Sequence, residues 1–308
     1  MKRKNKSPNS WQILRDIRNR IESIKNTQQI TRAMKMVAAA RLRKAQNKII
    51  ETRPYASKMK EVVARLIKNL GGDNILFRKP EKTDNVLLIV ISSDRGLCGA
   101  FNNNLFKEVQ STIDEDFSEY QESGNLSLVT LGKKGTKHFG KRNYKIKDSD
   151  TNFFDNIEFS KASEIMKEIV ADFVTGDLDA VYLAYNEFKS VIAQNRMIEQ
   201  VLPIDPATLL TEEQEEEGEE SIDYIYEPDV DSILEHLLPL HLNMQLWKAI
   251  LESNAAEQGA RMTAMDNATE NAKELQEDLQ LEYNQARQSA ITTEISEIVS
   301  GAQALEEA

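Results

Sequence analysis

Cysteine and histidine are nearly missing from this sequence. Its 308 residues include one cysteine, Cys98, which cannot form a disulfide within the chain and is typical of a reducing compartment. The three histidines are His138, His236 and His241, and no cysteine or paired carboxylate accompanies them at a metal-ligand spacing. The sequence therefore predicts neither a disulfide scaffold nor a metal centre.

Long apolar runs are missing as well. The longest uninterrupted run, Val86 to Ile91, falls far short of the ~20 residues that a membrane-spanning helix needs. Residues 1–10, MKRKNKSPNS, are basic without an apolar centre, so we expect a disordered basic tail rather than a secretory signal. Glycine (12) and proline (7) are few, which favours long helices over a turn-rich β fold.

Charge is divided unevenly along the chain, whose net charge is -11. Residues 2–60 hold seventeen Lys and Arg against three acids, a local charge of +14. Residues 250–308 hold twelve acids against three basic residues, a local charge of -9. Residues 211–222 are dense in glutamate and are predicted to form a solvated acidic loop. The two ends should attract each other, and the basic end could also dock on an acidic partner.

The N-terminal region has the periodicity of one long helix, predicted over residues 11–70. Pro54 is the only residue that interrupts the helical pattern. Apolar and small residues recur at steps of three or four, which predicts a continuous buried stripe on one face. This expected stripe consists of Ile13, Ile17, Ile21, Ile24, Thr27, Thr31, Met34, Ala38, Leu42, Ala45 and Ile49.

The C-terminal region, residues 223–305, contains a second long helical pattern, expected to begin only after Pro239. Alanines recur at every fourth position from Ala256 to Ala272, and such small side chains let a partner helix approach closely. We therefore predict an antiparallel coiled coil of the N- and C-terminal helices, closest at this alanine ridge. Two unrelated helices, or a coiled coil with another chain, are the alternatives.

Between these helices the sequence alternates strand-like and helical segments. The strand-like segments are NVLLIVI (85–91), LSLVTLG (126–132) and LDAVYLAYNEF (178–188), with QNRMIEQVLPI (194–204) as a candidate fourth. This alternation predicts a central Rossmann-like α/β domain with a mostly parallel sheet over residues 84–210.

The segment ISSDRGLCGAFNNNLFKEV (91–109) is the strongest candidate for chemistry. It follows a predicted strand and opens a predicted helix, which is where phosphate-binding loops lie. It nevertheless lacks GxGxxG and GxxxxGK[ST], and the chain offers no Ser/His/Asp set, so we expect no catalytic site and no bound cofactor. A nucleotide-handling enzyme remains an alternative, as does a nucleic-acid-binding coiled coil built on the basic first helix.

Taken in order, several motifs resemble the gamma subunit of F-type (rotary) ATP synthases. The resemblance covers nearly the whole chain. Its motifs are IRNRIESIKNTQQITRAMKMVAAARLRKAQ (17–46), RPYA (53–56), SSDRGLCGAFNNNLFK (92–107), DYIYEPD (223–229), SNAAEQGARMTAMDNATENA (253–272) and LEYNQARQSAITTEISEIVSGA (281–302).

This resemblance implies a non-catalytic subunit of an ion-transporting ATPase. In the family, the coiled coil stands inside a ring of alpha and beta subunits and is turned by a membrane ring of c subunits that passes protons or sodium ions. ATP, ADP and magnesium bind to the alpha and beta subunits. The implied partners are alpha, beta, epsilon and the c-ring, without nucleic acid, and with membrane contact only through the c-ring.

The resemblance also implies partner-contact residues and a location. Contact with the alpha/beta ring is implied for Met34, Arg261, Gln288 and Thr292, and contact with the c-ring for Tyr224, Tyr226 and Glu227. The dithiol insertion of chloroplast relatives is missing. This favours a peripheral position on the cytoplasmic side of a bacterial cell membrane, with the matrix side of the mitochondrial inner membrane as the alternative.

Overall fold

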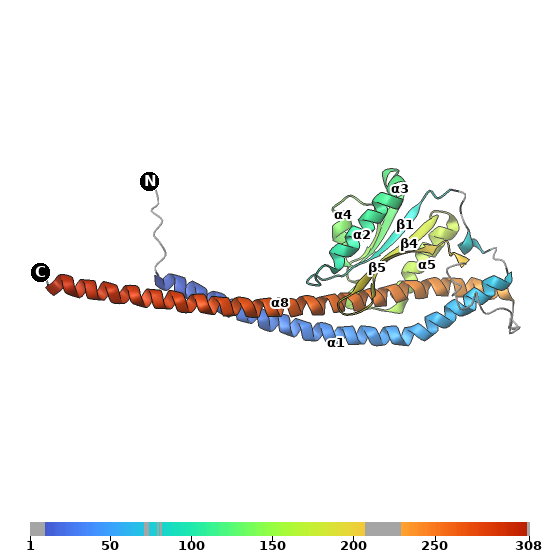
Figure 1. The fold of residues 1–308 in the computed structure, drawn as a ribbon. Coiled ribbons are helices and arrows are strands. Elements are labelled where there is room, and N and C mark those ends of the chain that lie inside the picture. The colour runs from blue at the N-terminus through green and yellow to red at the C-terminus, as the bar shows by residue number, and fades with distance from the viewer. Residues whose placement is uncertain (1–9, 71–73, 79, 81, 207–228, 307–308) are drawn as a thin grey trace. The chain divides into compact units, whose positions relative to one another are not determined.

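The computed structural model describes residues 10–70, 74–78, 80, 82–206 and 229–306 (Figure 1). The predicted acidic loop, 211–222, and residues 1–9 of the predicted tail lie outside this part of the chain. The elements are α1 (Ser10–Leu70), η1 (Ile75–Phe77), β1 (Val86–Ile91), α2 (Phe101–Asp116), α3 (Ser118–Glu122), β2 (Leu126–Leu131), α4 (Lys133–Gly140), β3 (Ile146–Asp150), η2 (Phe153–Asp155), α5 (Phe159–Thr175), β4 (Ala180–Phe188), β5 (Gln194–Leu202) and α8 (Val230–Glu306).

The chain divides into two compact units, and the larger one, residues 38–263, is built around a five-stranded sheet. The strand order is β3-β2-β1-β4-β5. The first four strands are parallel, and β5 pairs with β4 in the antiparallel sense. This arrangement confirms the predicted α/β domain with its mostly parallel sheet, and it adds an edge strand, β3, that the sequence pattern did not predict.

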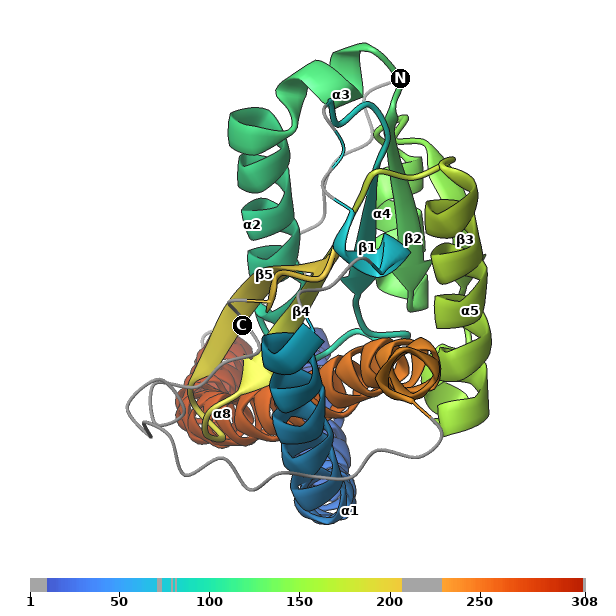
Figure 2. The ribbon, with the colours of Figure 1, turned by 90° about the vertical axis from the view of Figure 1, so that its right-hand side faces the viewer.

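Alternate residues of the central strand β1 face opposite sides of the sheet. Leu87 and Ile89 join a core cluster with α5, while Leu88 and Val90 join a second cluster with α2 and α4. Figure 2 shows α2 and α5 on opposite sides of the sheet. All six β1 residues are buried, because a strand covered on both faces needs apolar side chains in both directions. Each such fully buried side chain contributes about 1.5–3 kcal/mol.

The C-terminal part of α1 and the N-terminal part of α8 pack on the α5 side of the sheet. Leu234, Leu238, Leu242 and Leu246 recur every fourth residue of α8 and are all buried there. Helix α8 begins at Val230, so the expectation that it starts only after Pro239 is wrong. Proline removes one helical hydrogen bond, and the buried leucines on either side of it supply the packing that keeps this turn helical.

The smaller unit contains residues 10–37 and 264–306 of the described chain, and its two helical segments run antiparallel. The Thr31 and Thr269 hydroxyls lie 2.7 Å apart, and Lys35 Nζ lies 2.5 Å from Asp266 Oδ1. Numbers rise on one helix as they fall on the other, which confirms the predicted antiparallel coiled coil.

The buried stripe of this coiled coil differs from the predicted one at two positions. Leu14 is 6% exposed, whereas Ile13 is 41% exposed. At the second position, Gln28 is half-buried, whereas Thr27 is exposed and donates a hydrogen bond to the Ser23 carbonyl. The paired face follows the steps of three and four that run through Leu14. Gln28 therefore lies on this face although it is polar, in place of the predicted Thr27.

Candidate functional site

The loop between β1 and α2, residues 92–100, is held in a defined conformation by a buried side chain from α2. Asn102 Oδ1 accepts a hydrogen bond from the Ser93 backbone N–H at 3.0 Å. Asn102 Nδ2 donates to Ser93 Oγ at 2.7 Å and to Cys98 Sγ at 3.3 Å. Burial raises the pKa of the Cys98 thiol, so the sulfur stays protonated and serves packing rather than reactivity.

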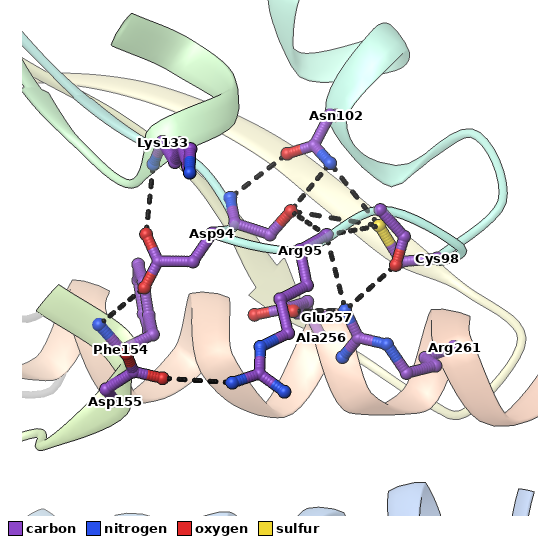
Figure 3. Close-up of polar contacts among 12 residues, drawn as sticks. Asp94, Arg95, Cys98, Asn102, Lys133, Phe154, Asp155, Ala256, Glu257 and Arg261 are labelled. Carbon is purple, nitrogen blue, oxygen red and sulfur yellow. Dashed lines mark hydrogen bonds and ion pairs between the residues drawn. The ribbon is translucent and has the colours of Figure 1, made fainter. Parts of the chain in front are cut away.

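Asp94 joins this β1–α2 loop to the segments that follow two other strands (Figure 3). Its carboxylate accepts hydrogen bonds from the Lys133 and Phe154 backbone N–H groups, both at 2.9 Å. Burial raises the pKa of Asp94 even though these two hydrogen bonds act in the opposite direction. The next residue, Arg95, forms an exposed ion pair with Asp155 at 3.4 Å, which contributes little by comparison.

A buried ion pair on α8 fastens the β1–α2 loop to that helix (Figure 3). Arg261 Nη2 donates to Glu257 Oε1 at 2.5 Å, to the Arg95 carbonyl at 3.4 Å and to the Gly96 carbonyl at 3.3 Å. The side chains of Arg261 and Glu257 are 10% and 6% exposed. Burial raises the pKa of Glu257, and the neighbouring guanidinium opposes that rise. The next loop residue, Leu97, has φ +63°, which costs about 1–2 kcal/mol and must be held by such contacts.

Small residues on α8 complete the attachment. Ala256 clusters with Cys98 and Phe101 of the α/β domain, with Ala260 beside them. Helix α1 packs instead through Leu42, Ala45 and Ile49 onto Leu251 and Ala255. The α/β domain therefore packs against the alanine ridge at Ala256 and Ala260. The prediction that this ridge marks the closest approach of the two long helices is wrong at these two positions.

The C-terminal end of α8 carries a second candidate site, an apolar stripe with no cover among the described residues. Every residue from 291 to 305 is exposed. The stripe continues the steps of three and four of the coiled coil and consists of Ile291, Ile295, Ile298, Ala302 and Leu305. Exposed apolar stripes of this kind mark surfaces that pack against a partner.

Comparison with known proteins agrees with this architecture. The family model described as ATP synthase matches residues 13–305. The ATP synthase gamma chain of Salinibacter ruber is 49% identical over 96% of this chain and 98% of its own length. The chain belongs to the ATP synthase gamma-chain family. The Chlorobaculum tepidum gamma chain is 48% identical over 96% of this chain and 99% of its own.

Solved structures give the same result for the fold. A chain of the Tetrahymena thermophila mitochondrial ATP synthase central stalk and c-ring structure is 26% identical, with a TM-score of 0.57. The match covers 78% of this chain and 99% of that chain. A chain from the Euglena gracilis mitochondrial ATP synthase, in an OSCP/F1/c-ring structure, has a TM-score of 0.64 at 20% identity and covers 95% of this chain and 94% of that one.

The residues for which the gamma-chain resemblance implied partner contacts differ in how exposed they are. Gln288 and Thr292 are exposed near the apolar stripe, and Met34 is half-buried. Arg261 is buried and bonded within the chain. The residues expected at the c-ring, Tyr224, Tyr226 and Glu227, lie outside the described residues. None of these partner contacts is tested by the fold, so they stay predictions.

Two features of this chain could not be predicted from its sequence. Glu257 and Arg261 are four residues apart, a spacing that signals a helical ion pair, but burial of the pair depends on the distant β1–α2 loop. The second feature is the cationic face at α4, a helix that the sequence pattern did not predict.

Within the described part of the chain, no group of three or more His, Cys, Asp or Glu is placed to hold a metal ion. None of the described helices combines the length and hydropathy needed to cross a bilayer.

Proposed function

We propose that this chain is the central rotor shaft of an F-type ATP synthase. It would couple rotation of a c-ring, driven by protons or sodium ions, to ATP synthesis or hydrolysis on the alpha/beta ring. The observation that carries the proposal is the apolar stripe of Ile291 to Leu305, which continues the coiled coil beyond its last internal partner. A shaft that turns inside a ring needs such a surface, whereas a free-standing enzyme does not.

The shaft itself forms no bonds in this proposal. ATP, ADP and magnesium are held by the alpha and beta subunits, and the chain's task is to transmit torque. Rotation must pass between the α/β domain and the long helices without slipping. The Arg261–Glu257 pair and the Ala256 packing support this role, because they join the β1–α2 loop to α8 through buried contacts.

The partner contacts follow from the same proposal. Met34, Gln288 and Thr292 face the alpha/beta ring, while Tyr224, Tyr226 and Glu227 contact the c-ring. The epsilon subunit is the remaining partner of the stalk. For Arg261 we infer an internal role, because its guanidinium is already bonded to the β1–α2 loop and Glu257. The bacterial relatives favour a peripheral position on the cytoplasmic side of a cell membrane.

Reconstitution tests the absence of a catalytic site. The purified chain should not hydrolyse ATP, and adding alpha and beta subunits should create steady ATPase activity. A matched pair of assemblies, with and without this chain, shows whether the shaft drives turnover. Turnover by the pure chain that persists through repeated purification would contradict the proposal.

A second experiment addresses the c-ring contact. Replacing Tyr224, Tyr226 and Glu227 together with alanine should leave the ATPase activity of the soluble complex intact but abolish proton pumping in sealed vesicles. Glu274→Gln, at an exposed position of α8, is the control and should pump normally. Normal pumping by the triple variant would remove these residues from the c-ring contact.

A further inference from the structure

A cavity of about 340 Å³ lies beside the β1–α2 loop. One wall is the loop from Gly96 to Gly99 with the first turn of α2, and the other wall is α4. These walls follow the carboxyl ends of β1 and β2, the edge of a parallel sheet at which open α/β folds bind ligands. The Lys134 ammonium lies 3.4 Å from the place that a Cβ on Gly96 would take, so the two walls meet.

The charged side chains that line this cavity are all cationic. They are Lys134, Lys137, Lys141 and Arg142, and no carboxylate is among the lining residues. None of the four forms an ion pair with any residue that the structure describes. Lys134 and Lys137 lie on α4, and Lys141 and Arg142 directly follow its last residue, so the four like charges lie close together and repel each other. A solvated helix face of ordinary composition would interleave acids with these bases.

His138 adds a hydrogen-bond donor for which the described residues supply no acceptor. Arg142 Nη1 lies 3.3 Å from His138 Nδ1, and since a guanidinium only donates, Nδ1 accepts. Burial lowers the pKa of His138, so the ring is neutral at pH 7 and Nε2 carries the hydrogen. That Nε2 atom is buried and has no partner among the described residues. The Phe106 ring, 4.3 Å away between centroids, fixes the imidazole plane.

We propose that this cavity binds a phosphate-type oxyanion, either free or as part of a nucleotide. Its polar lining supplies donors and cations, which is the complement that an oxyanion needs. The β1–α2 loop lacks the glycine pattern with which backbone N–H groups usually cradle phosphate. In this chain, side chains of α4 and of the two residues after it take over that task. The cavity shares Gly96 and Cys98 with the attachment to α8, but its four cations take no part in that attachment, so the proposal can be tested independently of the rotor function.

Calorimetric titration of the full chain with inorganic phosphate, and in parallel with magnesium-free ATP, tests the proposal. The variant Lys137→Gln/Lys141→Gln removes two lining charges. The control Lys167→Gln/Lys189→Gln removes two exposed charges elsewhere, so both variants have the same net charge. We expect saturable binding at one site by the wild-type chain, about tenfold or more weaker in the cavity variant and unchanged in the control.

Each other outcome has a definite meaning. Binding of ATP that is tighter than that of phosphate, and equally sensitive to the cavity variant, would support the site and assign it to nucleotide phosphates. An equal loss in both variants would mean that binding follows net charge alone and would overturn the proposal. Failure of the wild-type chain to bind either probe at millimolar concentration would also overturn it.

Nuclear magnetic resonance of the histidine rings locates the anion without changing any lysine. The chain has only three histidines, so the His138 nitrogen signals can be assigned by comparison with His138→Gln. Phosphate should shift the His138 Nε2 signal and leave those of His236 and His241 in place. No shift at His138, or equal shifts at all three, would contradict the proposal.

Discussion

The buried ion pair between Arg261 and Glu257 yields the sharpest prediction about the attachment of the β1–α2 loop. Replacing Arg261 with methionine keeps the volume but leaves a carboxylate that is 6% exposed without its cation. Breaking one partner of a buried pair costs about 3–5 kcal/mol. For a unit of this size the melting temperature should fall by roughly 6–20 °C.

The direction in which the stability of the Arg261→Met chain changes with pH follows from the raised pKa of Glu257. Burial raises the pKa of Glu257 in the folded chain, and removing Arg261 removes the group that opposes this rise. A carboxyl with a raised folded pKa penalises folding only once it ionises. The penalty is absent below its unfolded pKa of about 4.3 and develops as the pH rises through the raised folded value. The Arg261→Met chain should therefore be less impaired at about pH 4 than at about pH 7.

A double-mutant cycle separates the pair from its surroundings. Glu257→Leu/Arg261→Met replaces both charges with apolar groups, so it should lose only about 1–2 kcal/mol, mostly from the hydrogen bonds to the Arg95 and Gly96 carbonyls. Urea unfolding followed by the fluorescence of Trp247, in a Trp11→Phe background, reports on the larger unit. Equal stability of Arg261→Met and wild type, or a double variant whose loss is the sum of the single losses, would refute the reasoning.

Three further predictions concern separate parts of the chain. Gly259→Leu should lower the free energy of unfolding by about 1–3 kcal/mol in urea, because an added Cβ already lies 3.3 Å from the Phe188 ring, whereas Gly301→Ala, with nothing within 4 Å, should not destabilise the chain. Burial lowers the pKa of His241 to about 4, so stability should fall by roughly 3 kcal/mol as the pH drops from about 6.5 towards 4, and a His241→Leu chain that kept this slope in urea unfolding would contradict the assignment. Ile295→Ser, at a side chain 56% exposed, should leave unfolding unchanged but reduce the yield of complex with alpha and beta subunits on size-exclusion chromatography; equal yields for it and the control Glu294→Gln would count against the apolar stripe.

Local sequence patterns were sufficient for the central strands but not for the edge of the sheet. The runs at 85–91 and 126–132 are apolar because these strands are covered on both faces, and the structure places β1 and β2 there. Strand β3, with the sequence IKDSD, is polar and mostly exposed. Its backbone pairs with β2, so its structure comes from the neighbouring strand rather than from its own side chains.

Features that depend on tertiary contacts were predicted less well. Pro239 looked like a helix boundary because proline loses a hydrogen bond, yet buried leucines on both sides hold the turn in α8. The alanines at 256 and 260 were correctly identified as a close-packing face, but the sequence could not say which element would approach it. The Arg261–Glu257 pair was invisible for the same reason, because its burial depends on the β1–α2 loop more than 150 residues earlier.

Direct observation of rotation tests the central claim. A cysteine introduced at Lys107, an exposed position on α2, in a Cys98→Ser background would carry a gold particle, and the alpha/beta ring would be fixed to a surface. With ATP, the account predicts that the particle makes full turns in one direction, and that the turns stop when ATP is removed. A ring that hydrolyses ATP while the particle stays still would contradict the assignment of this chain as the rotor.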